Sequence, residues 1–138
     1  MENTAPKVAI EGASLVLLAK NLEQTVQFYS GIGFTHEVIG SKVKHHHVSR
    51  DHLTFILVEA AREDEVKPIS SCYEEQYFDV YWYSNAVDLL AQEMTEKNIT
   101  IVREPHYTEH WSEFTFRDPN GYQITVGGGV GNRERVSG

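Results

Sequence analysis

The chain has 138 residues, of which 41% are hydrophobic, and a formal net charge of −8 at pH 7. This length allows one domain with a substantial core and leaves little room for a second. The acidic balance argues against nucleic acid as a partner, because the phosphate backbone would repel the protein. No apolar run approaches the roughly 20 residues that cross a bilayer, so no transmembrane helix is expected.

The first twelve residues, MENTAPKVAIEG, show little pattern and are expected to form an arm. They lack the basic stretch followed by an apolar segment that marks a secretory signal. Cys72 is the only cysteine, so no disulfide can form within the chain. Both features predict a cytoplasmic protein.

The first clear elements are a strand and a helix. ASLVLLA, which begins at Ala13, is an apolar run of strand length. Asn21 is placed to cap the helix that follows, with Gln24 three residues further on, as in a capping box. Gly31 and Gly33 end the helix, because glycine adopts left-handed backbone geometry at little cost. Three strands follow, with the sequences FTHEVIG, KVKHHHVS and LTFILVE.

Residues 61–76 are polar and irregular and are expected to link two units. After them the same order of elements repeats. The strand FDVYWY precedes a helix that Ser84 or Asn85 would cap and that Asn98 would end. Asn85 follows Asn21 by 64 residues, and this offset indicates an internal duplication. The closing strands are ITIVRE, SEFTFR and YQITV.

The last two strands meet at a turn, Asp118-Pro119-Asn120-Gly121, in which proline presets φ and Asn-Gly tolerates positive φ. Strand alternation then places Ile124 and Thr125 on opposite faces. The glycine-rich segment GGGVG is expected to follow the last strand and to fray. It does not open a helix, so it is no nucleotide motif.

These elements together resemble the vicinal oxygen chelate superfamily, which includes glyoxalase I, extradiol dioxygenases and bleomycin-resistance proteins. The resemblance covers about residues 13–128 and is carried by LVLLAKNLEQTVQFYSGIGF, AVDLLAQEMTEKNITIVREP and FTFRDPNGYQITV. It implies an α+β fold in which two βαβββ modules form a cupped mixed sheet, and usually a homodimer. The modules would span about 13–60 and 77–128, with an arm at 1–12 and a flexible tail at 129–138.

The enzymes that the chain resembles hold a divalent metal ion in the cup through His or Glu ligands. By that resemblance, the four ligand positions are Ser14, Ile56, Asp79 and Thr125. Only Asp79 is a good ligand, and Ile56 has no donor atom. The resemblance is therefore to the metal-free, bleomycin-resistance branch, and neither a metal ion nor another cofactor is expected.

Several aromatic and acidic side chains are candidates for binding a ligand. Asp79, Tyr81 and Tyr83 alternate in one strand and would face the cup together. Trp111 and Glu113 belong to EPHYTEHWSEF, which in relatives forms a loop at the mouth of the cleft. Such side chains suit an aromatic or cationic small molecule. A purely structural role for the tyrosines, and packing of Trp111 on the sheet edge, remain open alternatives.

The segment KHHHVSR places His45 and His47 on one face of a strand and His46 on the other. His45 and His47 are included among the ligand-binding candidates. Metal binding with help from His36 or His52, a plain polar face and a pH-sensitive ligand site remain open alternatives.

The preferred function is therefore binding and sequestering of a small aromatic or cationic molecule, with no catalytic residue assigned. The alternative is a metal-dependent lyase, isomerase or dioxygenase of the same superfamily with unusual ligands. A structural or regulatory interaction module is less favoured, because the implied architecture creates a cleft.

Overall fold

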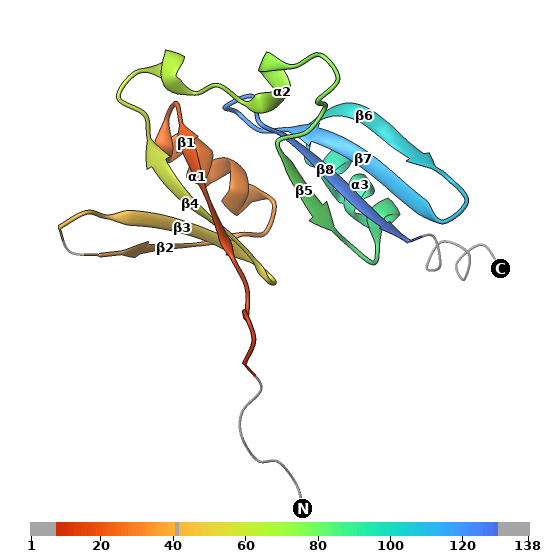
Figure 1. Ribbon diagram of the computed structural model, residues 1–138, viewed down its shortest axis with the longest axis horizontal. Coiled ribbons are helices and arrows are strands. Elements are labelled where there is room, and N and C mark those ends of the chain that lie inside the picture. Colours follow the sequence, from red (N-terminus) through yellow and green to blue (C-terminus); the bar gives the residue numbers. More distant parts are fainter. Residues whose placement is uncertain (1–7, 41, 130–138) are drawn as a thin grey trace, which may run out of the picture.

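The computed structural model describes residues 8–40 and 42–129. It contains two four-stranded sheets, each accompanied by one helix of ten residues (Figure 1). In each sheet the four strands lie side by side in the order first, fourth, third, second, counted along the chain. This arrangement confirms the α+β fold of two βαβββ modules.

The two modules have corresponding elements. The first contains β1 (Ser14–Ala19), α1 (Leu22–Gly31), β2 (Thr35–Ile39), β3 (His45–Arg50) and β4 (Leu53–Glu59). The second contains β5 (Val80–Tyr83), α3 (Val87–Glu96), β6 (Thr100–Tyr107), β7 (Trp111–Arg117) and β8 (Gln123–Gly129). In each sheet the outer first strand runs parallel to its neighbour, and the remaining pairs are antiparallel.

The connection between the modules is more ordered than its composition predicts. It contains a short 3-10 helix, η1 (Glu63–Glu65), and a single-turn helix, α2 (Ile69–Cys72). Pro68 precedes α2, where its fixed φ suits a helix start and its missing N–H costs nothing. None of the described helices is long and apolar enough to cross a membrane.

The helix ends agree with the sequence in part. The side chain of Asn21 accepts a hydrogen bond of 2.9 Å from the backbone N–H of Gln24, which confirms the expected cap. The second cap was predicted wrongly, because α3 begins after Ala86. Ser84 Oγ instead accepts a hydrogen bond from the Ala86 N–H in the turn before the helix. Asn98 ends this module's helix with a φ of 60°, as expected.

The last strand is longer than predicted and includes the first glycines of GGGVG. Strand β8 pairs with β7 as far as Gly129, which lies opposite Trp111. These glycines allow other groups to approach the strand closely. A Cβ on Gly128 would lie 1.9 Å from the carbonyl oxygen of Ser84, so a side chain there would collide with the β5–α3 turn.

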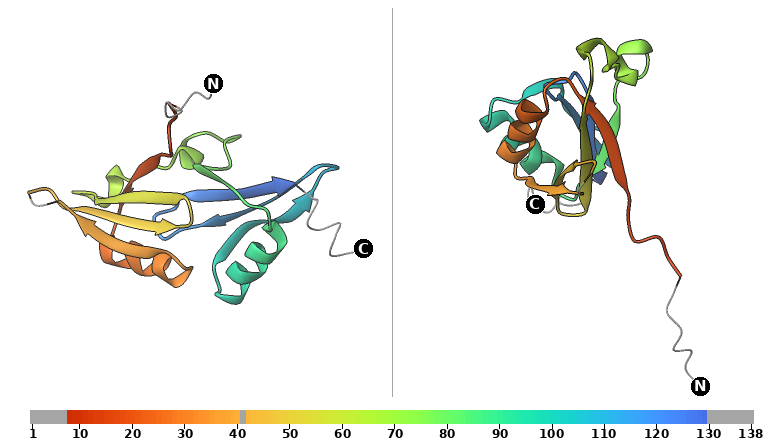
Figure 2. Two further views of the ribbon diagram at one scale, coloured as in Figure 1. Left: turned by 90° about the horizontal axis from the view of Figure 1, so that it is seen from below. Right: turned by 90° about the vertical axis from the view of Figure 1, so that its left-hand side faces the viewer.

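Both long helices cover the same side of the molecule, as Figure 2 (left) shows. Between helices and sheets lies a core that crosses from one module to the other. The buried ring of Trp82 in β5 lies 5.8 Å from Phe34, 6.2 Å from Phe55 and 5.3 Å from Phe116, measured between ring centroids. We call the opposite face of each sheet, which carries no helix, the open face.

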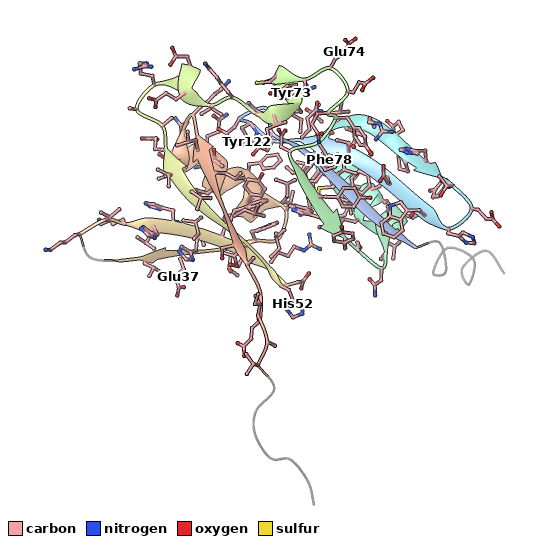
Figure 3. The ribbon with its side chains drawn as sticks, in the orientation of Figure 1. Glu37, His52, Tyr73, Glu74, Phe78 and Tyr122 are labelled. Atoms are coloured by element: carbon pink, nitrogen blue, oxygen red, sulfur yellow. The ribbon has the colours of Figure 1, made fainter. Side chains whose placement is uncertain are left out.

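The Asp118–Gly121 turn of the second module packs against the first module. The Asn120 side chain accepts a hydrogen bond of 2.8 Å from the Lys20 N–H and donates one of 3.1 Å to Thr25 Oγ1. Tyr122, labelled in Figure 3, donates from its hydroxyl to the carbonyl of Leu18 at 2.9 Å. The turn therefore fixes how the modules sit relative to each other, beyond reversing the chain.

Candidate functional site

A cavity of about 530 Å³ lies between the two modules. Its aromatic lining comes from Phe34 in the first module and from three consecutive residues of β5, Tyr81, Trp82 and Tyr83. Cavities of this size accommodate drug-sized molecules, and aromatic walls are typical of them. The cavity therefore suits a small ligand in both its size and its lining.

Charged side chains border the same cavity. Arg50 donates to the Ile32 carbonyl at 2.8 Å and lies 3.1 Å from Oε1 of Glu93, while its Nε lies 3.8 Å from Asp51. Because one guanidinium faces two carboxylates, these three side chains together carry a net charge of −1. The Asp51 side chain is 83% exposed, so its carboxylate remains accessible to a ligand.

The β3–β4 turn presents Asp51 to this cavity with a left-handed backbone. Asp51 has a φ of 54°, a conformation that Asp and Asn adopt more readily than other residues with a side chain. Its neighbour His52, labelled in Figure 3, also lines the cavity. Nothing in the sequence linked this turn to the site.

On the open face of the second sheet, a hydrogen-bond network holds Tyr81. Its hydroxyl donates to Oε2 of Glu113 at 2.5 Å and accepts from Nε1 of Trp111 at 2.7 Å. Tyr83 adjoins both aromatic residues, with ring centroids 5.1 Å from Tyr81 and 6.3 Å from Trp111. Four predicted ligand-binding residues thus lie together, but only Tyr81 and Tyr83 line the cavity.

The Tyr81 hydroxyl lies directly over the backbone of β8. A Cβ on Gly127 would be 2.1 Å from that hydroxyl oxygen and 2.8 Å from Nε1 of Trp111. Real Cβ atoms do not approach other atoms so closely, so only glycine fits beneath this ring. Gly127 therefore makes room for the network.

The network also sets two pKa values. Burial, followed by the hydrogen bond to Glu113, raises the pKa of Tyr81 to about 12. Burial alone would raise the pKa of Glu113, but hydrogen bonds from Tyr81 and Tyr77 and the nearby His106 and Arg103 outweigh it and lower that pKa. Tyr81 therefore remains a neutral donor and Glu113 a carboxylate at neutral pH.

Two basic side chains complete the surroundings of Glu113. Arg103 Nη1 and His106 Nε2 lie 3.6 and 3.7 Å from Glu113 Oε1, and Tyr77 donates to the same oxygen at 3.0 Å. The Arg103 guanidinium also stacks over the Tyr77 ring at 4.0 Å. The sequence provided no expectation of an arginine here, and the charge of Glu113 is largely balanced.

Asp79 occupies a different place from the one expected. Its carboxylate accepts hydrogen bonds from the Ser70 N–H at 2.8 Å, from Ser70 Oγ at 2.6 Å and from the Gln123 N–H at 2.8 Å. It thereby ties α2 to the start of β8, and it does not line the cavity. Its contacts are those of a side chain that anchors the connection between modules.

The four positions at which the resemblance predicts metal ligands offer few free donor atoms. Ile56 offers no donor, the Asp79 oxygens already accept three hydrogen bonds, and the buried Thr125 hydroxyl shares a 2.7 Å hydrogen bond with Thr115. Ser14, in the first sheet, is the fourth position. In the described parts of the chain, no group of three or more His, Cys, Asp or Glu side chains is arranged to hold a metal ion.

The histidines divide between two faces, as the sequence predicted. The His45 and His47 rings lie 6.3 Å apart on one face of the β2–β3 hairpin, and neither lines the cavity. On the other face, Nε2 of His36 lies 3.3 Å from Nδ1 of His46, a hydrogen-bonded pair. His36 therefore accompanies His46, and the structure does not bring it together with His45 and His47.

Comparisons with known proteins agree with this architecture. The sequence model of the Glyoxalase/Bleomycin resistance protein/Dioxygenase superfamily matches residues 13–126. A search of curated proteins finds no match.

Similar solved structures include TnmS3, an antibiotic binding protein from Streptomyces sp. CB03234, at 16% identity and a TM-score of 0.65, covering 90% of this chain and 99% of that one. TioX from Micromonospora sp. ML1 has 12% identity and a TM-score of 0.65, with 85% and 97% covered. An integron cassette protein from V. Cholerae has 18% identity and a TM-score of 0.64, with 90% and 98% covered. At these identities the likeness shows a common fold.

Proposed function

The chain belongs to the Glyoxalase/Bleomycin resistance protein/Dioxygenase superfamily, and from that premise we propose that it binds and sequesters a planar aromatic molecule, neutral or cationic, in the cavity between its modules. The observation that carries the proposal is the aromatic lining: Tyr81 and Tyr83, singled out in the sequence, line the cavity, as do Trp82 and Phe34. Aromatic faces bind planar rings by stacking and attract cations through their quadrupoles.

The charge preference rests on carboxylates other than the one expected. Asp79 already accepts three hydrogen bonds and does not line the cavity, so it is a poor partner for a ligand there. Asp51 and Glu93 border the cavity instead, and Arg50 offsets only one of them. A cation at this rim would meet an excess of negative charge, which solvent screens in part because the Asp51 side chain is 83% exposed.

One solved neighbour supports a binding role. TnmS3, which shares the fold, is an antibiotic binding protein. A cytoplasmic location and a homodimer remain predictions that accompany this proposal.

The proposal is tested by fluorescence titration with three planar probes of similar size. Proflavine is cationic, acridine is neutral at pH 7.5, and anthracene-9-carboxylate is anionic. We expect proflavine and acridine to bind in preference to the carboxylate. Asp51→Asn, which suits the left-handed backbone equally well, should weaken proflavine binding and leave acridine binding unchanged. If no probe binds, or the carboxylate binds best, the proposal is wrong.

A further inference from the structure

The side chains predicted to contact a ligand fall into two groups in the structure. Tyr81 and Tyr83 line the cavity, whereas Trp111 and Glu113 do not. Both of the latter instead bind the Tyr81 hydroxyl, one as donor and one as acceptor. We propose that Trp111 and Glu113 are positioning residues, which determine the cavity's affinity and selectivity by fixing the Tyr81 ring over Gly127. This inference rests on the proposed binding function.

Both hydrogen bonds are made by the Tyr81 hydroxyl, and together they define where the end of the ring lies. A tyrosine hydroxyl has one donor hydrogen and accepts through its lone pairs, so Glu113 and Trp111 use both roles at once. The 2.5 Å distance to Glu113 Oε2 is that of a charge-assisted bond, which is stronger than a neutral one. Tyr81 is therefore fixed by the contacts of its hydroxyl, and it is itself one of the residues that line the cavity.

Glu113 is itself held in place. Tyr77 donates to its Oε1, while Arg103 and His106 lie close to the same oxygen. Only 15% of the Glu113 side chain is exposed. Its remaining oxygen is thus directed to Tyr81, and the carboxylate has little freedom to turn toward a ligand.

Gly127 completes the arrangement by its lack of a side chain. A methyl group there would coincide with the space that the Tyr81 hydroxyl occupies. The same strand and face carry Gly129, where a Cβ would meet only the His110 carbonyl oxygen at 3.9 Å, an ordinary contact. The two glycines therefore form a matched pair: one underlies Tyr81 and the other does not.

A fixed aromatic wall favours binding because the ligand does not have to order it. Ordering a side chain on binding costs about 0.5–1.5 kcal/mol. Releasing Tyr81 should therefore weaken binding of a planar probe by about 3- to 10-fold. Mutations within one complex change its affinity mainly through the dissociation rate. We therefore expect these variants to release the probe faster.

The experiment measures proflavine affinity and dissociation rate for Tyr81→Phe, Trp111→Phe, Glu113→Ala and Gly127→Ala, with Gly129→Ala as the control. We expect the first four to weaken binding by about 3- to 10-fold and Gly129→Ala to change it by less than about twofold. Circular dichroism and thermal unfolding establish that each variant is folded. If Gly127→Ala does not fold, Tyr81→Phe, which removes only the hydroxyl, and Trp111→Phe, which removes the N–H donor, decide the test.

A double-mutant cycle separates positioning from direct contact. If Glu113 acts through the Tyr81 hydroxyl, Glu113→Ala should add little to Tyr81→Phe, because the hydroxyl it positions is already absent. Additive effects would overturn the inference and make Glu113 a contact residue. Unchanged binding in Trp111→Phe and Glu113→Ala would also overturn it. Failure of the unmodified protein to bind proflavine, acridine and the carboxylate would instead refute the proposed binding function.

Discussion

The hydroxyl of Tyr29 donates a hydrogen bond of 2.8 Å to Oδ2 of Asp118, and both side chains are buried. Tyr29 lies on α1 of the first module, and Asp118 opens the turn before β8 of the second. The other carboxylate oxygen accepts from the backbone N–H groups of Asn120 and Tyr122. One side chain thus shapes the turn and joins it to the neighbouring module.

We predict that Tyr29→Phe lowers the free energy of unfolding by about 1–3 kcal/mol, because it leaves a buried carboxylate oxygen without its closest donor. Urea denaturation followed by circular dichroism measures the change. Tyr73→Phe is the control, since Tyr73 is 67% exposed. Equal stability of the two variants would show that the Tyr29 hydrogen bond contributes nothing net.

A second prediction concerns stability in acid. The pKa of Glu113 is lowered in the folded protein from its ordinary value of 4.5, so folding favours the ionised carboxylate. The stabilisation is therefore fully present above pH 4.5 and is lost as the pH falls through the lower, folded-state pKa. We expect Glu113→Gln to lose less stability than the unmodified protein on acidification below pH 4.5. Urea midpoints of both proteins at pH 7, 5, 4 and 3 test this. If the two proteins lose stability equally as the pH falls, the prediction is wrong.

Strand alternation was enough to place part of the candidate site. Tyr81 and Tyr83 share a face because side chains alternate along β5, and the turn at Asp118 sets the register of the strand pair that carries Glu113. These relations are local or follow from one tight turn. The sequence therefore predicted a real cluster of side chains, although not the different roles of its members.

Arg103 was missed because its strand is irregular. The β6–β7 pairing shifts register between Ile101 and Arg103 and again between Arg103 and His106. Each shift changes which face later residues occupy, so counting along ITIVRE cannot place the arginine.

Asp79 and the cavity depend on contacts between distant segments. One partner of Asp79 is Ser70, in a connection that was expected to be irregular. The cavity wall combines Phe34, the Arg50–Leu53 turn and α3 residues such as Glu93. No local pattern encodes how two modules pack, so these neighbours emerge only in the folded structure.

A third prediction concerns metal content. Protein purified without a tag and dialysed should carry no stoichiometric zinc, nickel, manganese or iron, because Ile56 lacks a donor and the Asp79 carboxylate is already hydrogen-bonded. Elemental analysis by mass spectrometry measures this directly. A stoichiometric ion that is lost in Asp79→Ala but retained in Asp88→Ala would contradict the prediction and favour a metal-dependent activity.

The last prediction is that the protein forms a homodimer. On the open face of the first sheet, Val16 is 64% exposed and Val58 is 42% exposed, in neighbouring strands. Apolar side chains grouped on a sheet face are stabilised when another surface covers them, and closed pairs of identical subunits are the commonest way to do so. Light scattering at micromolar concentration should therefore give about twice the 15.7 kDa of one chain.

Val16→Glu should shift this equilibrium toward the monomer, because a carboxylate would have to be buried in the interface. Val43→Glu is the matched control: Val43 is 70% exposed and lies in the β2–β3 connection, away from that face. A mass near 15.7 kDa for the unmodified protein would refute the dimer. If the Val16→Glu variant dimerises as strongly as the Val43→Glu variant, the subunits meet through a different surface.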